Sequence, residues 1–312
     1  MTKIATRTAY GQTLARLGEQ YQEIVVLDAD LSKSTKTADF GKKFPERFIN
    51  VGIAEANLMA ISAGLAAAGK IPFASTFAIF ATGRGFEQIR NSIAYPKLNV
   101  KIAATHAGIS VGEDGGSHQA IEDVSLMRSL PNMTVVVPAD ATETARVIEA
   151  AVEYKGPMYI RLGRLDQPVI LPEDYQFELG KAVVLREGWD CAVFANGLMV
   201  GLALEAAEQL AKEGIEIAVV NVATVKPLDV ATIVEVSKRA GAVVTAEEHS
   251  IIGGLGSAVA EALSENAPVP MERLGVRDSF GESGAPYDLL EKYGLTAGNI
   301  AATVKKAMQK KK

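Results

Sequence analysis

Short apolar runs bounded by turn residues alternate along this chain with longer segments of helical period. In the first half the apolar runs occupy residues 24–30, 100–105, 133–137 and 158–162. Between them, Phe86, Ile89 and Ile93 share one helical face, and residues 141–154 are good helix formers. Runs that are apolar throughout and separated by helices are typical of a parallel sheet buried on both faces. The pattern therefore predicts an α/β fold.

This alternation is interrupted once, after Arg164. Two prolines and mixed polarity over residues 165–180 predict an extended connection. Apolar and helical segments then resume, at 191–195, 198–212, 217–222, 242–246 and from about Thr296. A chain of 312 residues has room for two domains. We predict a parallel-sheet domain over 1–170, a linker over 171–184 and a smaller α/β domain over 185–312.

Composition excludes several classes of partner. The formal net charge is -5, so the chain lacks the basic excess that nucleic-acid binding requires. The uncharged stretch 56–69 is too short to span a membrane and is expected to form a buried helix. The first residues contain no apolar signal core, and one cysteine, Cys191, forms neither an intrachain disulfide nor a cysteine-cluster metal site. We expect a cytoplasmic protein without nucleic-acid or membrane partners.

A glycine-rich loop over residues 112–118 concentrates polar chemistry. It contains two carboxylates, a hydroxyl and His118, and His106 lies shortly before it. The chain has only three histidines, so two of them belong to this segment. A loop that only turns needs glycine, asparagine or aspartate. Acids, hydroxyl and imidazole together predict a binding site for a polar ligand.

Glu55 and two phenylalanines are further candidates, each with a structural alternative. Glu55 opens a nearly uncharged segment, where a buried carboxyl group is a candidate proton donor or relay. Alternatively, it caps the first turn of a helix. Phe77 and Phe80 are spaced to clamp a planar ring, but such a pair also suits a hydrophobic core.

Several other polar motifs remain open on local sequence alone. Arg7, Arg161 and Arg164 each lie near the end of an expected element, where they either grip phosphate or remain solvated. The glycine-rich residues 253–257 lack the full dinucleotide fingerprint and are interpreted as a strand-to-helix turn. His249, next to two glutamates, receives no role.

Five segments, taken together and in order, resemble the pyrimidine-binding domain of transketolase. They are residues 47–55, 77–80, 104–106, 112–119 and 128–132. The resemblance covers most of residues 1–164. The second half resembles the family's C-terminal domain, including residues 226–229 and 253–257. No single motif is decisive, but five in register are specific.

The resemblance implies a cofactor, thiamine diphosphate. Glu55 is then the acid that hydrogen-bonds N1' of the aminopyrimidine, which favours the imino tautomer and formation of the ylid that attacks a ketose. Phe80 and Phe77 would line the pyrimidine pocket, and Asp30 would approach cofactor across a subunit interface. Gly83 stands where related enzymes often have a tyrosine, so the stacking surface is expected to be smaller.

The resemblance also implies a phosphorylated sugar substrate. Asp114 and the two histidines, His106 and His118, correspond to positions that contact the sugar and move protons. Positions that bind the sugar phosphate correspond to Arg7, Ser34, His106 and Arg164. Two arginines and a hydroxyl suit a dianionic group, because charge-assisted hydrogen bonds are the stronger contacts.

One family motif is missing. Transketolases bind the diphosphate through Mg²⁺ at a Gly-Asp-Gly motif in an N-terminal domain, and this sequence has no Gly-Asp dipeptide. It also begins directly at the pyrimidine domain. We therefore expect a C-terminal transketolase subunit whose separate N-terminal partner ligates Mg²⁺. An α₂β₂ assembly follows as the natural hypothesis, because two-fold symmetry would repeat each composite site.

The expected reaction is transfer of a two-carbon ketol unit from a ketose phosphate to an aldose phosphate. One alternative is the E1 β subunit of a 2-oxo acid dehydrogenase, which has similar domain order. Deoxyxylulose phosphate synthase shares the acid loop but is normally one chain. Another alternative is a non-catalytic assembly or regulatory subunit. The loop over 112–119 and the paired arginines favour sugar phosphates, and retention of Glu55 argues for catalysis.

Overall fold

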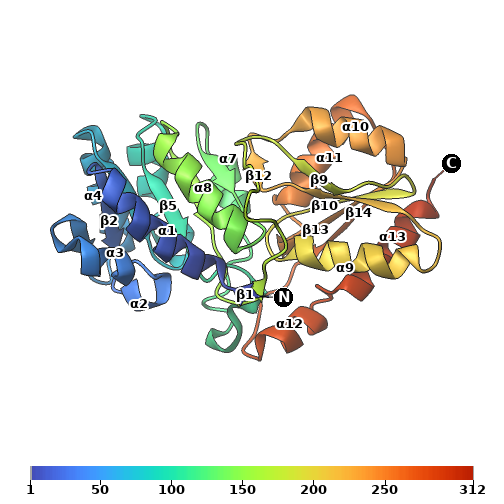
Figure 1. Cartoon of the computed structure of the whole chain (residues 1–312), viewed down its shortest axis with the longest axis horizontal. Helices are drawn as coiled ribbons and strands as arrows, with labels where there is room; N and C mark the ends of the chain where they lie inside the picture. Colours follow the sequence, from blue (N-terminus) through green and yellow to red (C-terminus); the bar gives the residue numbers. More distant parts are fainter. Residues whose placement is uncertain (1, 312) are drawn as a thin grey trace.

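The computed structural model describes residues 2–311 and contains two sheet-based domains side by side (Figure 1). The first sheet has seven strands in the order β12-β6-β7-β5-β4-β2-β3. In that order they are Thr224–Lys226, Thr134–Val136, Met158–Arg161, Lys101–Ala104, Ile71–Ser75, Ile24–Asp28 and Phe48–Asn50. All neighbours are parallel except β12, which runs antiparallel to β6. The α/β prediction is confirmed.

Helices cover both faces of this sheet, which is why its strands are apolar throughout. One face carries α1 (Thr6–Gln20), α3 (Ala38–Lys43) and α8 (Ala141–Glu153), which pack against alternate strand residues. The opposite face carries α4 (Glu55–Ala67), α5 (Ala78–Arg84), the π-helical turn η2 (Ile89–Ala94) and α7 (Asp123–Ser129). The short α2 (Ser32–Thr35) follows β2, and α6 (Phe86–Gln88) leads into η2.

Helix α4 is buried on one side only, which differs from the expectation of a buried helix over 56–69. Leu58 and Met59 are fully buried against the sheet. Ala60 and Gly64 lie on the outward side and are exposed. The segment 56–69 carries no charge, so its outward face is small and, apart from Asn57, apolar, and nothing in residues 2–311 covers it.

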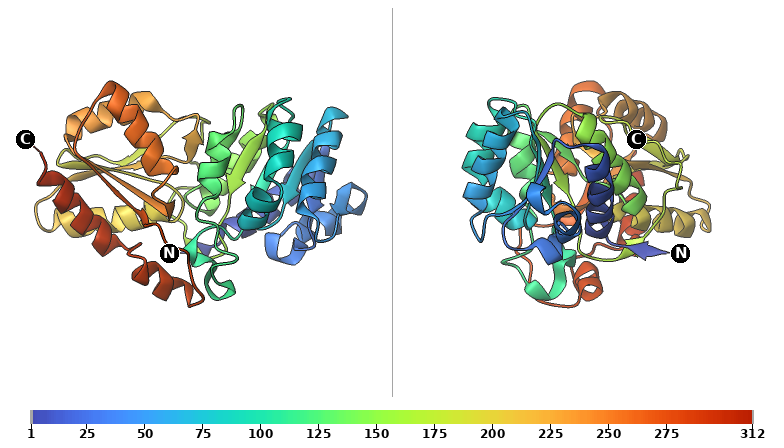
Figure 2. Two further views of the ribbon diagram at one scale, coloured as in Figure 1. Left: turned by 180° about the vertical axis from the view of Figure 1, so that it is seen from behind. Right: turned by 60° about the vertical axis from the view of Figure 1, so that its left-hand side comes forward.

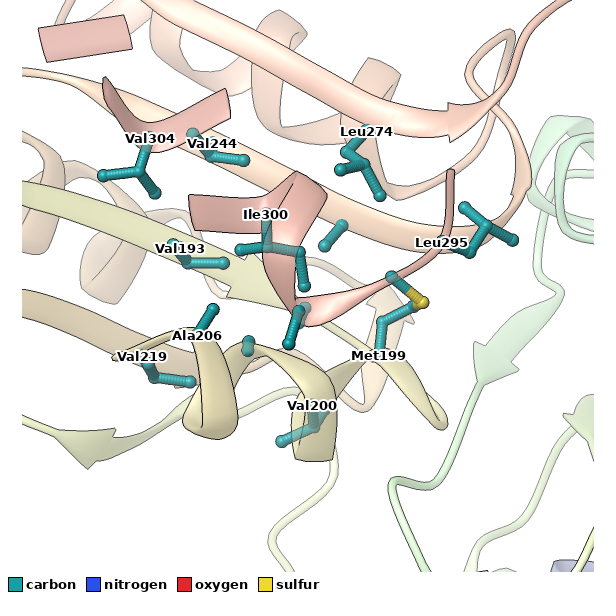
Figure 3. Packing of buried hydrophobic residues seen from close by; sticks show 14 of the residues in the cluster. Val193, Met199, Val200, Ala206, Val219, Val244, Leu274, Leu295, Ile300 and Val304 are labelled. Atoms are coloured by element: carbon teal, nitrogen blue, oxygen red, sulfur yellow. The ribbon is translucent and has the colours of Figure 1, made fainter. Parts of the chain in front are cut away.

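The second sheet has five strands in the order β14-β13-β10-β11-β9. They are Met271–Val276, Val243–Ser250, Cys191–Ala195, Ile217–Asn221 and Val183–Arg186, and only β9 is antiparallel to its neighbour. Helices α9 (Met199–Ala211) and α13 (Ala297–Met308) pack on one face, and α10 (Val230–Ala240) and α11 (Leu255–Asn266) on the other. Figure 3 shows Ile300 of α13 packing over Val193 and Met199.

Two pairings tie distant parts of the chain together. Strand β12 comes from the second half of the sequence but lies at the edge of the first sheet. Lys226 Nζ donates to the carbonyl oxygens of Arg128 (3.0 Å) and Leu130, at the end of α7. Near the N-terminus, β1 (Lys3–Ile4) pairs with β8 (Gln167–Pro168), so the first residues order the start of the extended connection expected over 165–180.

A buried polar cluster fills the contact between the two sheets. Arg161 Nε donates to Asp123 at 2.8 Å, and Arg161 Nη2 donates to the carbonyl of Glu248 at 2.9 Å. Burial alone would raise the pKa of Asp123, but the charges of Arg161 and, to a smaller extent, His249 hold this pKa below its usual value. Arg161 is therefore a structural residue rather than a phosphate ligand. His249 is also buried here, 2% exposed, at the end of β13.

The glycine-rich residues 253–257 form a strand-to-helix turn, as interpreted from the sequence. The amides of Leu255 and Gly256, which open α11, donate to the carboxylate of Glu247 at 2.7 and 2.8 Å. A buried acid thus holds the free amides that a bound anion would need. Across residues 2–311, no helix combines the length and the apolar character needed to cross a membrane.

Candidate active site

The candidate site lies at the carboxyl ends of β2, β4 and β5, where open parallel sheets commonly bind ligands. A cavity of about 470 Å³ opens there. Its lining consists of Ala29, Asp30, Leu31, Ile53, Glu55, Phe80, Arg84, Ser117 and His118. Four of the residues chosen from the sequence, Asp30, Glu55, Phe80 and His118, therefore converge on one cavity.

Glu55 is the first residue of α4, and its side chain is 5% exposed. Its carboxylate accepts a hydrogen bond from Arg84 Nη1 at 2.9 Å. Glu55 is the acid of the first turn of α4, but among the hydrogen bonds of residues 2–311 none joins its carboxylate to a free amide of this helix. The carboxylate instead faces the cavity.

The two phenylalanines have different positions. Phe77 is buried and stacks on the His106 ring, with centroids 3.8 Å apart. Phe80 is half-buried, lies 5.8 Å from Phe77 in a stacked arrangement and meets the edge of His118 at 5.2 Å. Phe80 lines the cavity, and Phe77 supports it from behind.

His106 is held in one tautomer. Arg7 Nη1 is always a donor, so the His106 Nε2 atom 3.2 Å away must accept. Nδ1 then carries the proton and donates to Thr105 Oγ1 at 2.9 Å. Burial, reinforced by Arg7 and Arg164, lowers the pKa of His106 to about 3. The imidazole is therefore neutral at physiological pH and acts as a hydrogen-bonding group.

This burial predicts acid sensitivity. Unfolded His106 binds a proton below its ordinary pKa of 6.5, whereas the folded residue does so only near 3, so stability is lost as pH falls through this window. The loss between pH 6.5 and 5 is expected to be about 1.5 kcal/mol. His106→Asn suits the left-handed φ of 56° at this position. Urea unfolding at both pH values should show a shallower pH dependence in this variant; equal slopes would contradict the assignment.

Arg7 and Arg164 are far apart in the sequence but lie close together in the structure, where the Arg7 amide donates to the carbonyl of Gly163 at 3.4 Å. Arg7 Nη1 also donates to the carbonyl of Ser34 at 2.9 Å, so Ser34 lies beside Arg7 and contacts it through its backbone. Arg164 Nη1 donates to Val111 O at 2.6 Å and lies 3.6 Å from the Asp114 carboxylate. Burial and the nearby charge of Arg164 lower the pKa of Arg7. An anion between the two guanidinium groups would relieve this repulsion.

The glycine-rich loop is clamped by the second domain, which the sequence did not reveal. Gln119 Nε2 donates to Ile109 O at 3.1 Å and to Glu282 O at 2.9 Å, and Ser283 Oγ donates to Glu113 O at 2.6 Å. Figure 2 shows the loop beside α12 (Pro286–Lys292), which follows these residues. Gln119 is buried and structural, whereas Asp114 is exposed beside Arg164.

Two further residues shape the cavity and were missed. Asn50 exchanges hydrogen bonds with Asp30, Nδ2 to Oδ1 at 3.0 Å and Asp30 N to Asn50 Oδ1 at 3.1 Å, which fixes the left-handed backbone of Asp30. Arg84 places its guanidinium carbon 4.2 Å from the centre of the Phe80 ring. The spacing of Phe80 and Arg84, one helical turn apart, was the available signal.

A planar ring with a protonated nitrogen would fit this arrangement. Glu55 supplies a buried acceptor, Phe80 supplies an aromatic face, and a Cβ at Gly83 would meet no atom within 4 Å. Within the described chain, no group of three or more His, Cys, Asp or Glu side chains is arranged to hold a metal ion.

Comparisons with known proteins cover both domains. The family described as "Transketolase, pyrimidine binding domain" matches residues 2–168, and "Transketolase, C-terminal domain" matches residues 180–300. A protein of Methanocaldococcus jannaschii named for a transketolase C-terminal section is 51% identical, over 97% of this chain and 96% of its own length. A 6-deoxy-6-sulfo-D-fructose transketolase subunit of Clostridium sp. is 46% identical, over 98% of this chain and 95% of its own length. The solved structure "Split gene transketolase, inactive beta4 tetramer" is 60% identical, with a TM-score of 0.93, over 99% and 100%.

Proposed function

Because this chain belongs to the transketolase family, we propose that it is the C-terminal subunit of a split transketolase that transfers a two-carbon ketol unit between sugar phosphates. The convergence of Glu55, Phe80 and His118 on one cavity is the observation that carries this proposal. Relatives of nearly the same length, named for a C-terminal section and for a split gene, support the division into subunits.

The residues present fit the ring of thiamine diphosphate. When bound, this cofactor supplies the nucleophilic carbon that attacks the donor carbonyl. Glu55 would hold a proton at N1' of the ring, and Phe80 would offer its face beside the open space at Gly83. We assign the diphosphate and Mg²⁺ to the N-terminal partner, because the sequence lacks a Gly-Asp dipeptide.

Ketol transfer breaks the C2–C3 bond of the donor, while the C3 hydroxyl loses its proton and C3 becomes an aldehyde carbon. A new bond to the acceptor aldehyde follows, and the acceptor oxygen gains a proton. His118, at the cavity wall, is positioned to exchange these protons. Neutral His106 and Asp114 would orient sugar hydroxyls, and Arg7 with Arg164 would bind the phosphate.

An exposed apolar surface borders the cavity and suits a subunit contact. Ile53, which lines the cavity, is 77% exposed, and the outward face of α4 carries exposed Ala60 and Gly64. Burial of such a face is favourable on association. We propose that this face is covered in an α₂β₂ complex, and that copies of this chain alone self-associate without activity.

The test is ketol transfer from xylulose 5-phosphate to ribose 5-phosphate with thiamine diphosphate and Mg²⁺. Activity is expected only when this chain is mixed with its N-terminal partner. Matched reactions replace the donor with 6-deoxy-6-sulfo-D-fructose or with pyruvate. A preference for the sulfonated sugar would replace the sugar phosphate as the proposed donor. Turnover of pyruvate would favour the 2-oxo acid dehydrogenase alternative. Full activity of this chain alone would contradict the split assembly.

A further inference from the structure

Arg84 makes both of the contacts that a cofactor ring would need. Its Nη1 lies 2.9 Å from the Glu55 carboxylate, and its guanidinium carbon lies 4.2 Å from the centre of the Phe80 ring. The guanidinium is planar and delocalised, so it can stack and hydrogen-bond at once, as an aminopyrimidine would. The side chain thus lies in the candidate cavity rather than beside it.

We infer that Arg84 is a placeholder in the cofactor-free subunit, and that it must leave Glu55 and Phe80 when the ring of thiamine diphosphate binds. The inference rests on the proposed function. Arg84 is not among the site residues implied by the family resemblance. Here its side chain competes with the cofactor ring for Glu55 and Phe80 and so lowers the affinity for the cofactor.

The two occupants exclude each other. The Glu55 side chain is 5% exposed, and among the described residues its hydrogen-bonding partner is Arg84. One face of Phe80 cannot stack on two planar groups at once. Arg84 ends α5, and its side chain is 54% exposed, so it has open solvent into which it can swing.

The placeholder also explains how Glu55 is tolerated without cofactor. A nearly buried carboxylate with no partner is costly, and the guanidinium meets this need until the ring replaces it. Only the fraction of subunits with Arg84 displaced can bind, so the apparent dissociation constant equals the intrinsic one divided by that fraction. The half-exposed ion pair and the cation–π contact are each weak, which makes the expected penalty about three- to tenfold.

The experiment measures binding of thiamine diphosphate with Mg²⁺ to the assembled two-subunit complex by titration calorimetry. Arg84→Ala should tighten binding by about three- to tenfold, because the competitor is removed and Glu55 is left without a partner. Arg84→Gln, which keeps a hydrogen-bond donor but lacks the charge and the stacking plane, should give an intermediate value and guards against a folding defect. The matched control is Arg90→Ala, an exposed residue of η2 outside the cavity, which should leave affinity unchanged.

Weaker binding in Arg84→Ala, with Arg90→Ala unchanged, would overturn the inference and make Arg84 a supporting residue of the bound state. Equal affinity in all variants would also overturn it. If neither the parent complex nor any variant binds thiamine diphosphate, the proposed function fails, and the inference fails with it. A structure of the loaded complex is a second readout, in which Arg84 should contact neither Glu55 nor Phe80.

Discussion

Replacing Glu55 with glutamine is expected to lower the turnover of the assembled enzyme by about 10²-fold or more, because acid–base assistance at the cofactor ring is lost. The carboxylate is nearly buried and faces the cavity, so no solvent group can substitute for it. Glutamine has almost the same volume, which limits packing damage. The measurement is kcat for ketol transfer at saturating thiamine diphosphate and Mg²⁺.

A matched variant separates this effect from a general loss of stability. Glu208→Gln makes the same chemical change at an exposed position of α9 and should leave kcat unchanged. Cofactor saturation must be verified in the Glu55→Gln complex, so that lost binding is not mistaken for lost chemistry. If the Glu55→Gln complex, saturated with cofactor, kept the turnover of the parent, Glu55 would not be the catalytic acid. The alternative of a non-catalytic assembly or regulatory subunit would then be favoured.

The sheet cores could be predicted because buried parallel strands leave a strong local signal. The runs 24–30, 100–105 and 158–162 became β2, β5 and β7, with ends within two residues of the expected ones. These strands are apolar throughout because helices cover both faces of the sheet. Such patterns are visible without knowledge of the tertiary structure.

Pairing between distant segments was not predictable in the same way. β12 has only three residues, Thr224–Lys226, and joins a sheet formed by the other half of the chain. Its pairing with β6 depends on contacts between the two halves of the chain, including the Lys226 hydrogen bonds at the end of α7. The exposed face of α4 was also missed, because small apolar residues look alike whether a core or another subunit covers them.

The site was partly predictable. Glu55 and the polar loop stood out because carboxylates and histidines are unusual in apolar or glycine-rich segments. Arg84 did not, since an arginine at the end of a helix is ordinarily solvated. Likewise, the neutral state of His106 depends on Arg7, 99 residues away, and on burial. Such effects belong to the folded structure and leave no local pattern.

Removing either Arg7 or Arg164 is expected to lower kcat/KM for xylulose 5-phosphate by about 10- to 10²-fold, because a charge-assisted contact to phosphate contributes about 1.5–3 kcal/mol. Arg7→Ala and Arg164→Ala should change turnover of D-xylulose, which has no phosphate, much less. The two guanidinium groups repel each other in the free protein, so removal of one also relieves the repulsion on the other. Because the phosphate contact binds substrate and transition state alike, the lower kcat/KM should appear mainly as a higher KM.

The comparison between the two donors distinguishes phosphate binding from structural support. Both arginines also hold backbone carbonyls, Ser34 O and Val111 O, so each truncation could loosen the site itself. A loosened site would impair both donors alike, whereas a lost phosphate contact impairs only the phosphorylated one. Arg16→Ala, on the same helix as Arg7 but paired with Glu149 on the surface, should affect neither donor. Equal losses for both donors would contradict the phosphate assignment and leave the arginines as supports of the loop.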